Sequence, residues 1–265
     1  MKIIAIANQK GGVGKTTTAI NLTHGLALAG KKVLLVDLDP QGNATQGFGI
    51  KVENVKVSIA DAIRNRSLAI ESCLYRAGKI DLLASNPLLS GLEREMVTMT
   101  NGELRLKQRL AELNGLYDLI LVDTPPTFGP LMNSALNAAT DVIIPVDSGF
   151  YALLGIKELL AEMEEIRFGT NPELEVLGFV NTMADKTNMT QQVIESLKQN
   201  FGTKLFSTNI RRSVKFREAA ALGMTIFDYA ENSTAAEDYL ALTSEVQNRT
   251  SNSPTLSLVS EVRCE

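Results

Sequence analysis

The sequence predicts an α/β fold in which helices flank both faces of one mostly parallel sheet. Short runs of aliphatic and β-branched residues alternate with longer segments of helical periodicity along the 265 residues. Several of the short runs are apolar almost throughout, which is typical of strands that are buried on both faces of a parallel sheet. Because strands and helices alternate, we expect βαβ units with right-handed connections around a single sheet.

The expected elements follow one another from the N-terminus to residue 247. Strands are expected at residues 2–7, 32–37, 80–84, 118–123, 141–146, 175–181 and 204–206. Helices are expected at residues 15–29, 103–113, 154–167, 190–200 and 234–246. No linker interrupts residues 1–247, so we expect one domain there, and the polar composition that follows predicts a flexible tail at residues 248–265.

Composition excludes several functional classes. The 26 Lys and Arg residues against 30 Asp and Glu residues give a formal net charge of −4, which argues against a wholly basic nucleic-acid-binding protein. The two cysteines, Cys73 and Cys264, stand in no paired motif, so neither a disulfide framework nor a cysteine-rich metal site is expected. The sequence shows no signal peptide and no apolar run long enough to span a membrane. We therefore expect a cytoplasmic protein without a membrane partner.

The strongest motif is Gln-Lys-Gly-Gly-Val-Gly-Lys-Thr-Thr at residues 9–17, directly after the first expected strand and directly before the first helix. Its glycines let the backbone wrap closely around a phosphate chain, and the N–H groups at the start of the helix point toward the anion. Lys15 is expected to bridge the outer phosphates, and the hydroxyl of Thr16 is expected to ligate Mg²⁺. The predicted cofactor-binding residues of this loop are Gly11, Gly12, Val13, Gly14, Lys15, Thr16 and Thr17. The alternative is a glycine-rich turn that only links strand to helix.

Lys10 adds a second cation to this loop. In the usual P-loop pattern G-x-x-x-x-G-K-T, the first glycine would stand at Gln9. Two lysines in one loop would crowd along a single triphosphate, so Lys10 is expected to point away, toward a nucleotide held by another subunit. The alternative is a solvated loop lysine.

Aspartates at the ends of two expected strands complete the site. Asp39 follows the second strand, at the edge of the sheet where ligands of open α/β folds collect, and its carboxylate could orient a water toward the γ-phosphate. Asp37 faces the same way by strand period and could support Mg²⁺ or the loop. Asp123 ends an apolar strand in the manner of a Walker B carboxylate, which holds Mg²⁺ through water; the alternative is an aspartate that caps the next turn. Residues 125–129 are expected to form a switch-like loop.

The Lys-Gly-Gly-Val-Gly-Lys-Thr-Thr sequence resembles the deviant Walker A motif of the ParA/MinD ATPases, and small Soj-like ParA partition ATPases most of all. The similarity continues at residues 33–43 and 119–126 and extends to about residue 247. The resemblance implies a P-loop ATPase that uses ATP and Mg²⁺ and forms an ATP-sandwich homodimer. It also implies catalytic roles for Lys10, which would reach across the dimer, for Lys15, and for Asp39, which would position the attacking water.

The base is less clearly specified by the sequence. A GTPase would usually show Asn-Lys-x-Asp, whereas the sixth expected strand ends in Asn-Thr-Met-Ala-Asp at residues 181–185. ATP is therefore the expected nucleotide. The resemblance implies that Asn181 contacts the adenine; the alternative is an ordinary asparagine at the end of a strand.

A basic segment is the candidate for an interaction with DNA. Residues 204–217 contain five basic residues and no acidic one. Residues 212–219 resemble the Arg-Asn-Val-Arg-Leu-Ser-Glu-Ala stretch of the family, in which Lys215 takes the place of an arginine implicated in DNA contact. The predicted DNA-binding residues are Arg211, Arg212, Lys215 and Arg217. The alternative is an ordinary solvated start of a helix.

These observations favour a ParA-like ATPase that binds DNA without sequence preference as its ATP dimer and lets go after hydrolysis. The resemblance implies a ParB-like or other adaptor protein that stimulates hydrolysis, a nucleoid-associated location in the cytoplasm, and a plasmid, chromosome region or protein compartment as cargo. Two alternatives stay open: a membrane-associated spatial regulator similar to MinD, and an ATP-dependent metabolic enzyme on the same fold. The tail at residues 248–265 lacks the basic amphipathic pattern that the first alternative requires.

Overall fold

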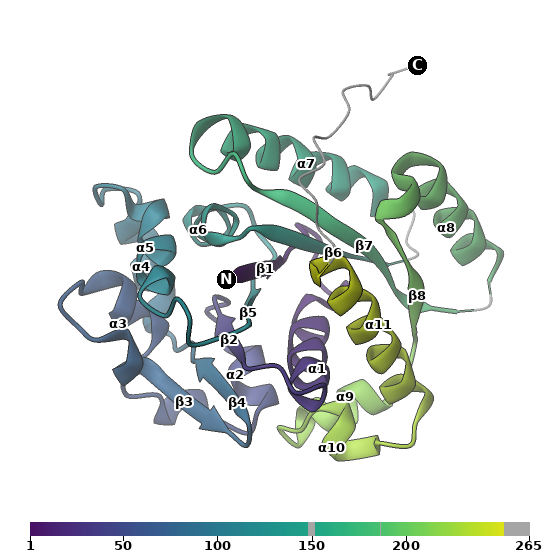
Figure 1. The fold of residues 1–265 in the computed structure, drawn as a ribbon, viewed down its shortest axis with the longest axis horizontal. Coiled ribbons are helices and arrows are strands. Elements are labelled where there is room, and N and C mark those ends of the chain that lie inside the picture. Colours follow the sequence, from purple (N-terminus) through teal and green to yellow (C-terminus); the bar gives the residue numbers. More distant parts are fainter. Residues whose placement is uncertain (148–151, 186, 252–265) are drawn as a thin grey trace.

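One sheet forms the centre of the molecule (Figure 1). The computed structural model describes residues 1–147, 152–185 and 187–251. Within these residues the strand order is β3-β4-β2-β5-β1-β6-β7-β8, and neighbouring strands run parallel except for the edge pair β3 and β4. The strands are β1 (Lys2–Ile6), β2 (Val33–Asp37), β3 (Leu74–Ala77), β4 (Ile80–Leu83), β5 (Leu119–Asp123), β6 (Asp141–Asp147), β7 (Glu175–Ala184) and β8 (Leu205–Arg211). The predicted fold class is confirmed.

Helices cover both faces of this sheet (Figure 1). They are α1 (Lys15–Leu28), α2 (Asn43–Gly47), α3 (Ile59–Arg64), α4 (Leu88–Met96), α5 (Arg105–Ala111), α6 (Pro130–Ala138), α7 (Ala152–Gly169), α8 (Asn188–Phe201), α9 (Lys215–Ala221), α10 (Ile226–Ala230) and α11 (Thr234–Ser251). On one face Ile4 and Ile6 pack with apolar residues of α1, α2, α10 and α11. On the other face Ile3 and Ala5 pack with residues of α3 to α8. The alternation along β1 shows why an entirely apolar strand was required.

The structure differs from the sequence prediction at the edges of the sheet. The strand β3 was not predicted, because it is a short antiparallel edge strand whose side chains are only partly buried and therefore lack a continuous apolar run. The strand β8 continues past the predicted end to Arg211, and only Phe206 and Ile210 along it are buried. The helices α2, α3, α4, α6, α9 and α10 were also missed; they are short, and short helices carry little periodic signal.

The last helix is longer than predicted and includes residues 248–251, which were expected to belong to a flexible tail. Arg249 anchors this turn. Its guanidinium donates a hydrogen bond to the carbonyl oxygen of Leu177 at 2.9 Å and lies 3.9 Å from the ring centroid of Phe206. These contacts with β7 and β8 keep the helix on the sheet. The rest of the predicted tail, residues 252–265, lies outside the described residues.

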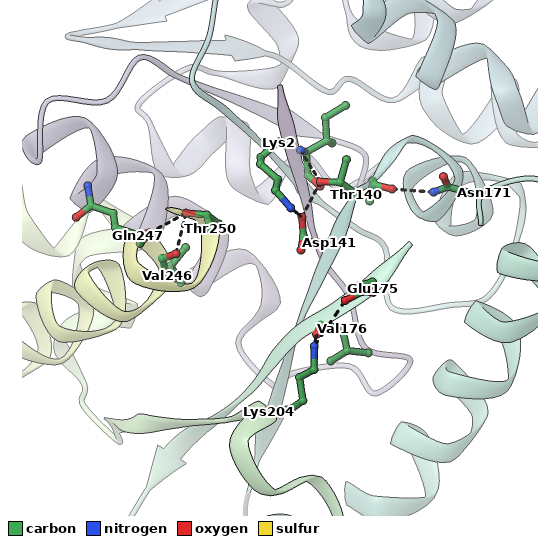
Figure 2. Close-up of polar contacts among 12 residues, drawn as sticks. Lys2, Thr140, Asp141, Asn171, Glu175, Val176, Lys204, Val246, Gln247 and Thr250 are labelled. Carbon is green, nitrogen blue, oxygen red and sulfur yellow. Dashed lines mark hydrogen bonds and ion pairs between the residues drawn. The ribbon is translucent and has the colours of Figure 1, made fainter. Parts of the chain in front are cut away.

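Polar contacts secure the edge of the sheet at which the strands begin (Figure 2). Lys2 forms an ion pair with Asp141 at 2.9 Å, which joins the starts of β1 and β6. Lys204 donates a hydrogen bond to the carbonyl oxygen of Val176 at 2.7 Å. Lys204 therefore lies at the edge opposite to the end of β8, and the basic window of residues 204–217 does not form one continuous surface.

Candidate nucleotide site

The loop between β1 and α1 has the conformation of an anion cradle. Gly12 and Gly14 adopt the left-handed backbone conformation, with φ of +76° and +86°, which residues with a side chain rarely adopt. The carbonyl oxygen of the buried Val13 accepts a hydrogen bond from the hydroxyl of Thr182 at 2.8 Å, which holds the loop against β7. Because α1 begins at Lys15, the N–H groups and positive dipole end of its first turn lie beside the loop. This arrangement suits a phosphate group.

Lys15 places a buried positive charge in the loop. Its side chain is buried, and its Nζ donates a hydrogen bond to the carbonyl oxygen of Lys10 at 3.0 Å. Burial lowers the pKa of Lys15, while the charges of Asp123 and Asp39 act in the opposite direction. The ammonium therefore lies near both carboxylates that the sequence assigned to the site.

Asp37 and Asp123 are neighbours at the carboxyl edge of the sheet. The register of β2 and β5 pairs Asp37 with Asp123, and the register of β1 and β5 pairs Ile6 with Asp123. The phosphate-binding loop leaves β1 at this same edge. Residues that are more than a hundred positions apart along the chain are thus brought together, as expected for ligand sites in open parallel sheets.

The carboxylate of Asp123 has the properties of a cation ligand. The side chain is fully buried, and among the described residues neither of its oxygens has a hydrogen-bond partner. Burial raises the pKa of Asp123, the neighbouring Asp37 raises it further, and the nearby hydroxyl of Thr16 acts in the opposite direction. A buried carboxylate is otherwise costly, so a divalent cation with Thr16 and phosphate oxygens beside it fits this position.

The described residues contain no group of three or more His, Cys, Asp or Glu side chains that could hold a metal ion by themselves. Mg²⁺ commonly takes one or two carboxylates together with phosphate oxygens and water. The donor set near Asp123 therefore fits a cation that arrives with a nucleotide.

Asp37 supports the loop after β2. One carboxylate oxygen accepts the N–H of Asp39 at 3.1 Å, and the other accepts the N–H and the hydroxyl of Thr45, both at 2.7 Å. Burial raises the pKa of Asp37 to about 6, although these hydrogen bonds favour its charged form. Of the two roles left open by the sequence, the printed contacts of Asp37 are those of support for the loop.

Asp39 is held at the start of the following turn. Its side chain is 8% exposed, and its Oδ1 accepts the N–H of Gln41 at 2.9 Å. The hydroxyl of Ser85 donates to the carbonyl oxygen of Asp39 at 2.6 Å, which fixes the backbone. Its charge acts on Lys15, so the carboxylate lies within electrostatic range of the phosphate-binding loop.

Lys10 lies apart from Lys15. Its Nζ forms an ion pair with Asp147 at the end of β6, and 37% of the Lys10 side chain is exposed. The two lysines of the loop therefore have separate environments, as the crowding argument predicted.

A cavity of about 280 Å³ adjoins the loop. It lies between the start of α1, the end of β7 and the segment that joins β8 to α9. Its lining residues are Gly14, Thr17, Thr182, Met183, Ile210, Arg211, Arg212, Ser213, Phe216, Arg217, Ala220 and Tyr239. Met183 was not predicted as a site residue, and its φ of +54°, unusual for a side chain of this size, is a signal that only the structure contains.

Asn181 is fully buried in β7 near this cavity. Its Nδ2 donates a hydrogen bond to Oδ1 of Asn209 on β8 at 2.8 Å. The contact joins two neighbouring strands at the same register position. A role of Asn181 in contact with adenine remains a prediction.

The predicted DNA-binding residues lie at the end of β8 and at the start of α9. Arg211 is paired with Asp238, with 2.6 Å between its Nη2 and Oδ1 of the carboxylate, and this pair ties β8 to α11. The side chains of Arg212, Lys215 and Arg217 are exposed and, among the described residues, form no ion pair. The unpaired positive charge is therefore concentrated on these three residues.

The glycine-rich loop at the start of a helix, its buried lysine and the strand-end carboxylate define a P-loop nucleotide-binding protein. A family profile described as an AAA domain matches residues 1–176. The chain is 44% identical over 247 residues to the chromosome-partitioning ATPase Soj of Thermus thermophilus, which covers 93% of this chain and 95% of that protein. It is 42% identical over 247 residues to the sporulation initiation inhibitor protein Soj of Bacillus subtilis, which covers 92% and 98%. The chain belongs to the ParA/MinD family of P-loop ATPases.

Solved structures agree with this assignment. A cobyrinic acid a,c-diamide synthase from Mycobacterium smegmatis with bound ADP and magnesium has a TM-score of 0.84 and 28% identity, covering 98% of this chain and 100% of that one. A plasmid partition protein from Borrelia burgdorferi has a TM-score of 0.76 at 24% identity and covers 94% and 98%, which supports the fold. The ligands of the first neighbour support the prediction of ATP and Mg²⁺. No helix in the described part of the chain is long and apolar enough to cross a membrane.

Proposed function

We propose that this protein is a Mg²⁺-dependent ATPase that partitions DNA or another cargo, and that it works as an ATP-bound homodimer on DNA. The observation that carries the proposal is the combination of the buried Lys15 with the unpartnered carboxylate of Asp123 at one edge of the sheet. The relatives named as chromosome-partitioning ATPases supply the biological setting.

The chemistry follows from the residues around the loop. The N–H groups at the start of α1 and the ammonium of Lys15 bind and orient the phosphates. Thr16 and Asp123 hold Mg²⁺, which offsets charge on the transferring phosphoryl group. Asp39, fixed by Gln41 and Ser85, orients the attacking water. Positioning and electrostatic stabilisation are the main requirements of phosphoryl transfer.

Lys10 is proposed to complete the site of the partner subunit. It is separated from Lys15 and partly exposed, as a residue that acts in trans must be. A cation supplied from a second subunit would stabilise charge that develops in the transition state, as an arginine finger does. Hydrolysis would then depend on dimerisation.

The exposed residues Arg212, Lys215 and Arg217 are proposed to contact DNA phosphates. Lys215 and Arg217 lie on α9, and two of the three residues also line the cavity beside the phosphate-binding loop. Arg211 would contribute mainly by holding the segment, since Asp238 already neutralises its charge. A dimer presents two such surfaces, which strengthens salt-dependent binding without sequence preference. The adaptor that stimulates hydrolysis and the cargo on the nucleoid are part of the same proposal.

A second candidate function rests on the structural neighbour from Mycobacterium smegmatis, which is named as a synthase and is 28% identical. An ATP-dependent enzyme of that kind would form an amide product in addition to ADP and phosphate. Incubation with ATP and Mg²⁺ followed by analysis of products would separate the two, because an ATPase of the partition type needs no second substrate.

ATP turnover by three variants tests the phosphate site. Lys15→Gln is expected to lose nucleotide binding, because the buried ammonium is the main cation of the loop. Lys10→Ala is expected to bind ATP but to fail in dimerisation and hydrolysis. Asp39→Ala is expected to remain a DNA-bound dimer that does not turn over. Normal ATP affinity in Lys15→Gln would contradict the site assignment, and full activity in Lys10→Ala would contradict action in trans.

Anisotropy of a random-sequence DNA duplex over a series of salt concentrations tests the DNA surface. Single alanine variants of Arg212, Lys215 and Arg217 are each expected to weaken ATP-dependent binding and to reduce the log–log salt slope by up to about 0.9. Lys204→Ala is the matched control, because Lys204 belongs to the same basic stretch but lies at the opposite edge of the sheet. Equal losses in all four variants would contradict the assigned surface.

A further inference from the structure

Lys10 is held within its own subunit by Asp147. Its Nζ lies 2.9 Å from Oδ1 and 2.7 Å from Oδ2 of that carboxylate, so both oxygens engage one ammonium group. The exposed fractions of the two side chains are 37% and 22%. A pair of this kind is accessible enough to open, yet it occupies the ammonium while it is closed.

The backbone around this ion pair is fixed by Asn8. The Asn8 side chain is 2% exposed, its Nδ2 donates to the carbonyl oxygen of Pro145 at 2.7 Å, and its Oδ1 accepts the N–H of Lys10 at 2.9 Å. One buried side chain therefore joins the phosphate-binding loop to β6 two residues before Asp147. This link keeps Lys10 opposite Asp147, so the pair follows from the fold and not from a chance contact between two surface side chains.

Lys10 also borders open space. With Gln9, Pro126, Phe128 and Glu158 it lines a hollow of about 680 Å³ between the phosphate-binding loop, the loop after β5 and α7. Once released from Asp147, the flexible Lys10 side chain has room to move toward the surface of the subunit. The structure thus offers one arrangement in which the ammonium is bound in cis and the space for another.

We propose that Asp147 is a positioning residue that competes with the partner subunit's nucleotide for Lys10, so the ion pair must open before the ATP dimer can close. This inference rests on the proposed action of Lys10 in trans. The ammonium of Lys10 cannot pair with Asp147 and with a phosphate of the partner at the same time. The free energy of the cis pair is therefore subtracted from the free energy of dimerisation, and Asp147 sets the protein concentration at which the dimer forms.

The size of the effect follows from the exposure of the pair. Partly exposed ion pairs of this kind change an equilibrium by a factor of about two to five. Asp147→Asn is expected to lower the dissociation constant of the ATP dimer by about that factor. Asp147→Glu, which keeps the charge, is expected to stay close to the wild type. The affinity of the isolated subunit for nucleotide is expected to be unchanged in both variants, because Lys10 serves the other subunit.

Sedimentation velocity over a concentration series, with Mg²⁺ and a slowly hydrolysed ATP analogue, measures the dimer. A fluorescent nucleotide at low protein concentration measures affinity of the single subunit. Glu95→Gln is the matched control, since it removes another ion pair in which both carboxylate oxygens contact one partner, Arg64, at 2.9 and 3.0 Å. Thermal unfolding of every variant checks the fold, and Asp147→Ser serves if Asp147→Asn does not fold.

Tighter dimerisation in Asp147→Asn, with wild-type behaviour in Asp147→Glu and Glu95→Gln, supports the competition. An unchanged or weaker dimer in Asp147→Asn, while the wild type still dimerises on ATP, overturns the role of Asp147 and leaves the proposed function intact. The absence of any ATP-dependent dimer in the wild type overturns both.

Discussion

Replacement of Asp123 with asparagine is expected to stabilise the ligand-free protein while removing its response to Mg²⁺. The native state buries this carboxyl group completely, and no partner among the described residues satisfies its oxygens. Burial raises its pKa, so the native state disfavours the charged form that the unfolded chain adopts at neutral pH. An amide of similar shape avoids the charge but still buries polar atoms. We therefore expect the free energy of unfolding to rise by about 1–3 kcal/mol.

Thermal unfolding of wild type and variant without nucleotide measures this gain, at roughly 2–4 °C in Tm for each kcal/mol. The gain depends on pH in a defined direction. Because the folded pKa of Asp123 lies above its ordinary value of 3.8, the carboxyl group disfavours folding little below that pH and more as pH rises through the folded pKa. The difference between the Tm values of variant and wild type is therefore expected to be larger at pH 8 than at pH 5.

Addition of Mg²⁺ and an ATP analogue tests the second half of the prediction. The wild type should gain stability by binding, whereas Asp123→Asn should gain much less, because the cation loses its carboxylate. Asp141→Asn is the control: its carboxylate is also buried but is paired with Lys2 at 2.9 Å, so its loss should destabilise the protein. The reasoning is refuted if Asp123→Asn is destabilised to the same extent as the control, or if it keeps the full response to Mg²⁺ and nucleotide.

Two further predictions concern the helices around α1. A Cβ atom at Gly25 would collide with the hydroxyl of Thr243 on α11, so Gly25→Ala should lower the free energy of unfolding by about 1–3 kcal/mol. Gly91→Ala in α4 meets no atom within 4 Å and should be neutral or raise stability by up to about 1 kcal/mol; urea unfolding compares the two, and equal effects would contradict the packing argument. Burial lowers the pKa of His24 below its ordinary value of 6.5, so its contribution to stability is lost as pH falls from 6.5 through the folded pKa. His24→Gln should reduce the loss of stability between pH 7.5 and pH 5, and since His24 is the one histidine of the sequence, an unchanged pH profile would exclude this cause.

The fold class and the phosphate-binding loop were predictable from sequence because their signals are local. A strand buried on both faces must be apolar throughout, and a backbone that turns around an anion needs residues such as Gly12 and Gly14 that tolerate positive φ. The same logic identified Lys15 and Asp123 as site residues. Their roles in catalysis, like those of Lys10 and Asp39, stay predictions for the assays above.

The short elements and the edge strands were not predictable, because tertiary contacts specify them. Residues 248–251 look like a polar tail in the sequence, yet Arg249 reaches β7 and Phe206 and prolongs α11. The basic stretch of residues 204–217 reads as one patch, yet the strand β8 separates its ends, and Asp238 from a later helix neutralises Arg211. Charge counted along a sequence includes neither the length of a strand nor a partner from elsewhere in the chain.

By itself, the sequence determined that this chain is a P-loop protein of the ParA/MinD type, since motif and strand pattern are properties of neighbouring residues. Only the tertiary structure decided where its charges go. Lys10 meets Asp147 across 137 positions, and Asp37 comes to lie beside Asp123 through the register of β2 and β5. Such pairs arise when the sheet is assembled, because strands distant in the chain become neighbours and bring their end residues to one edge.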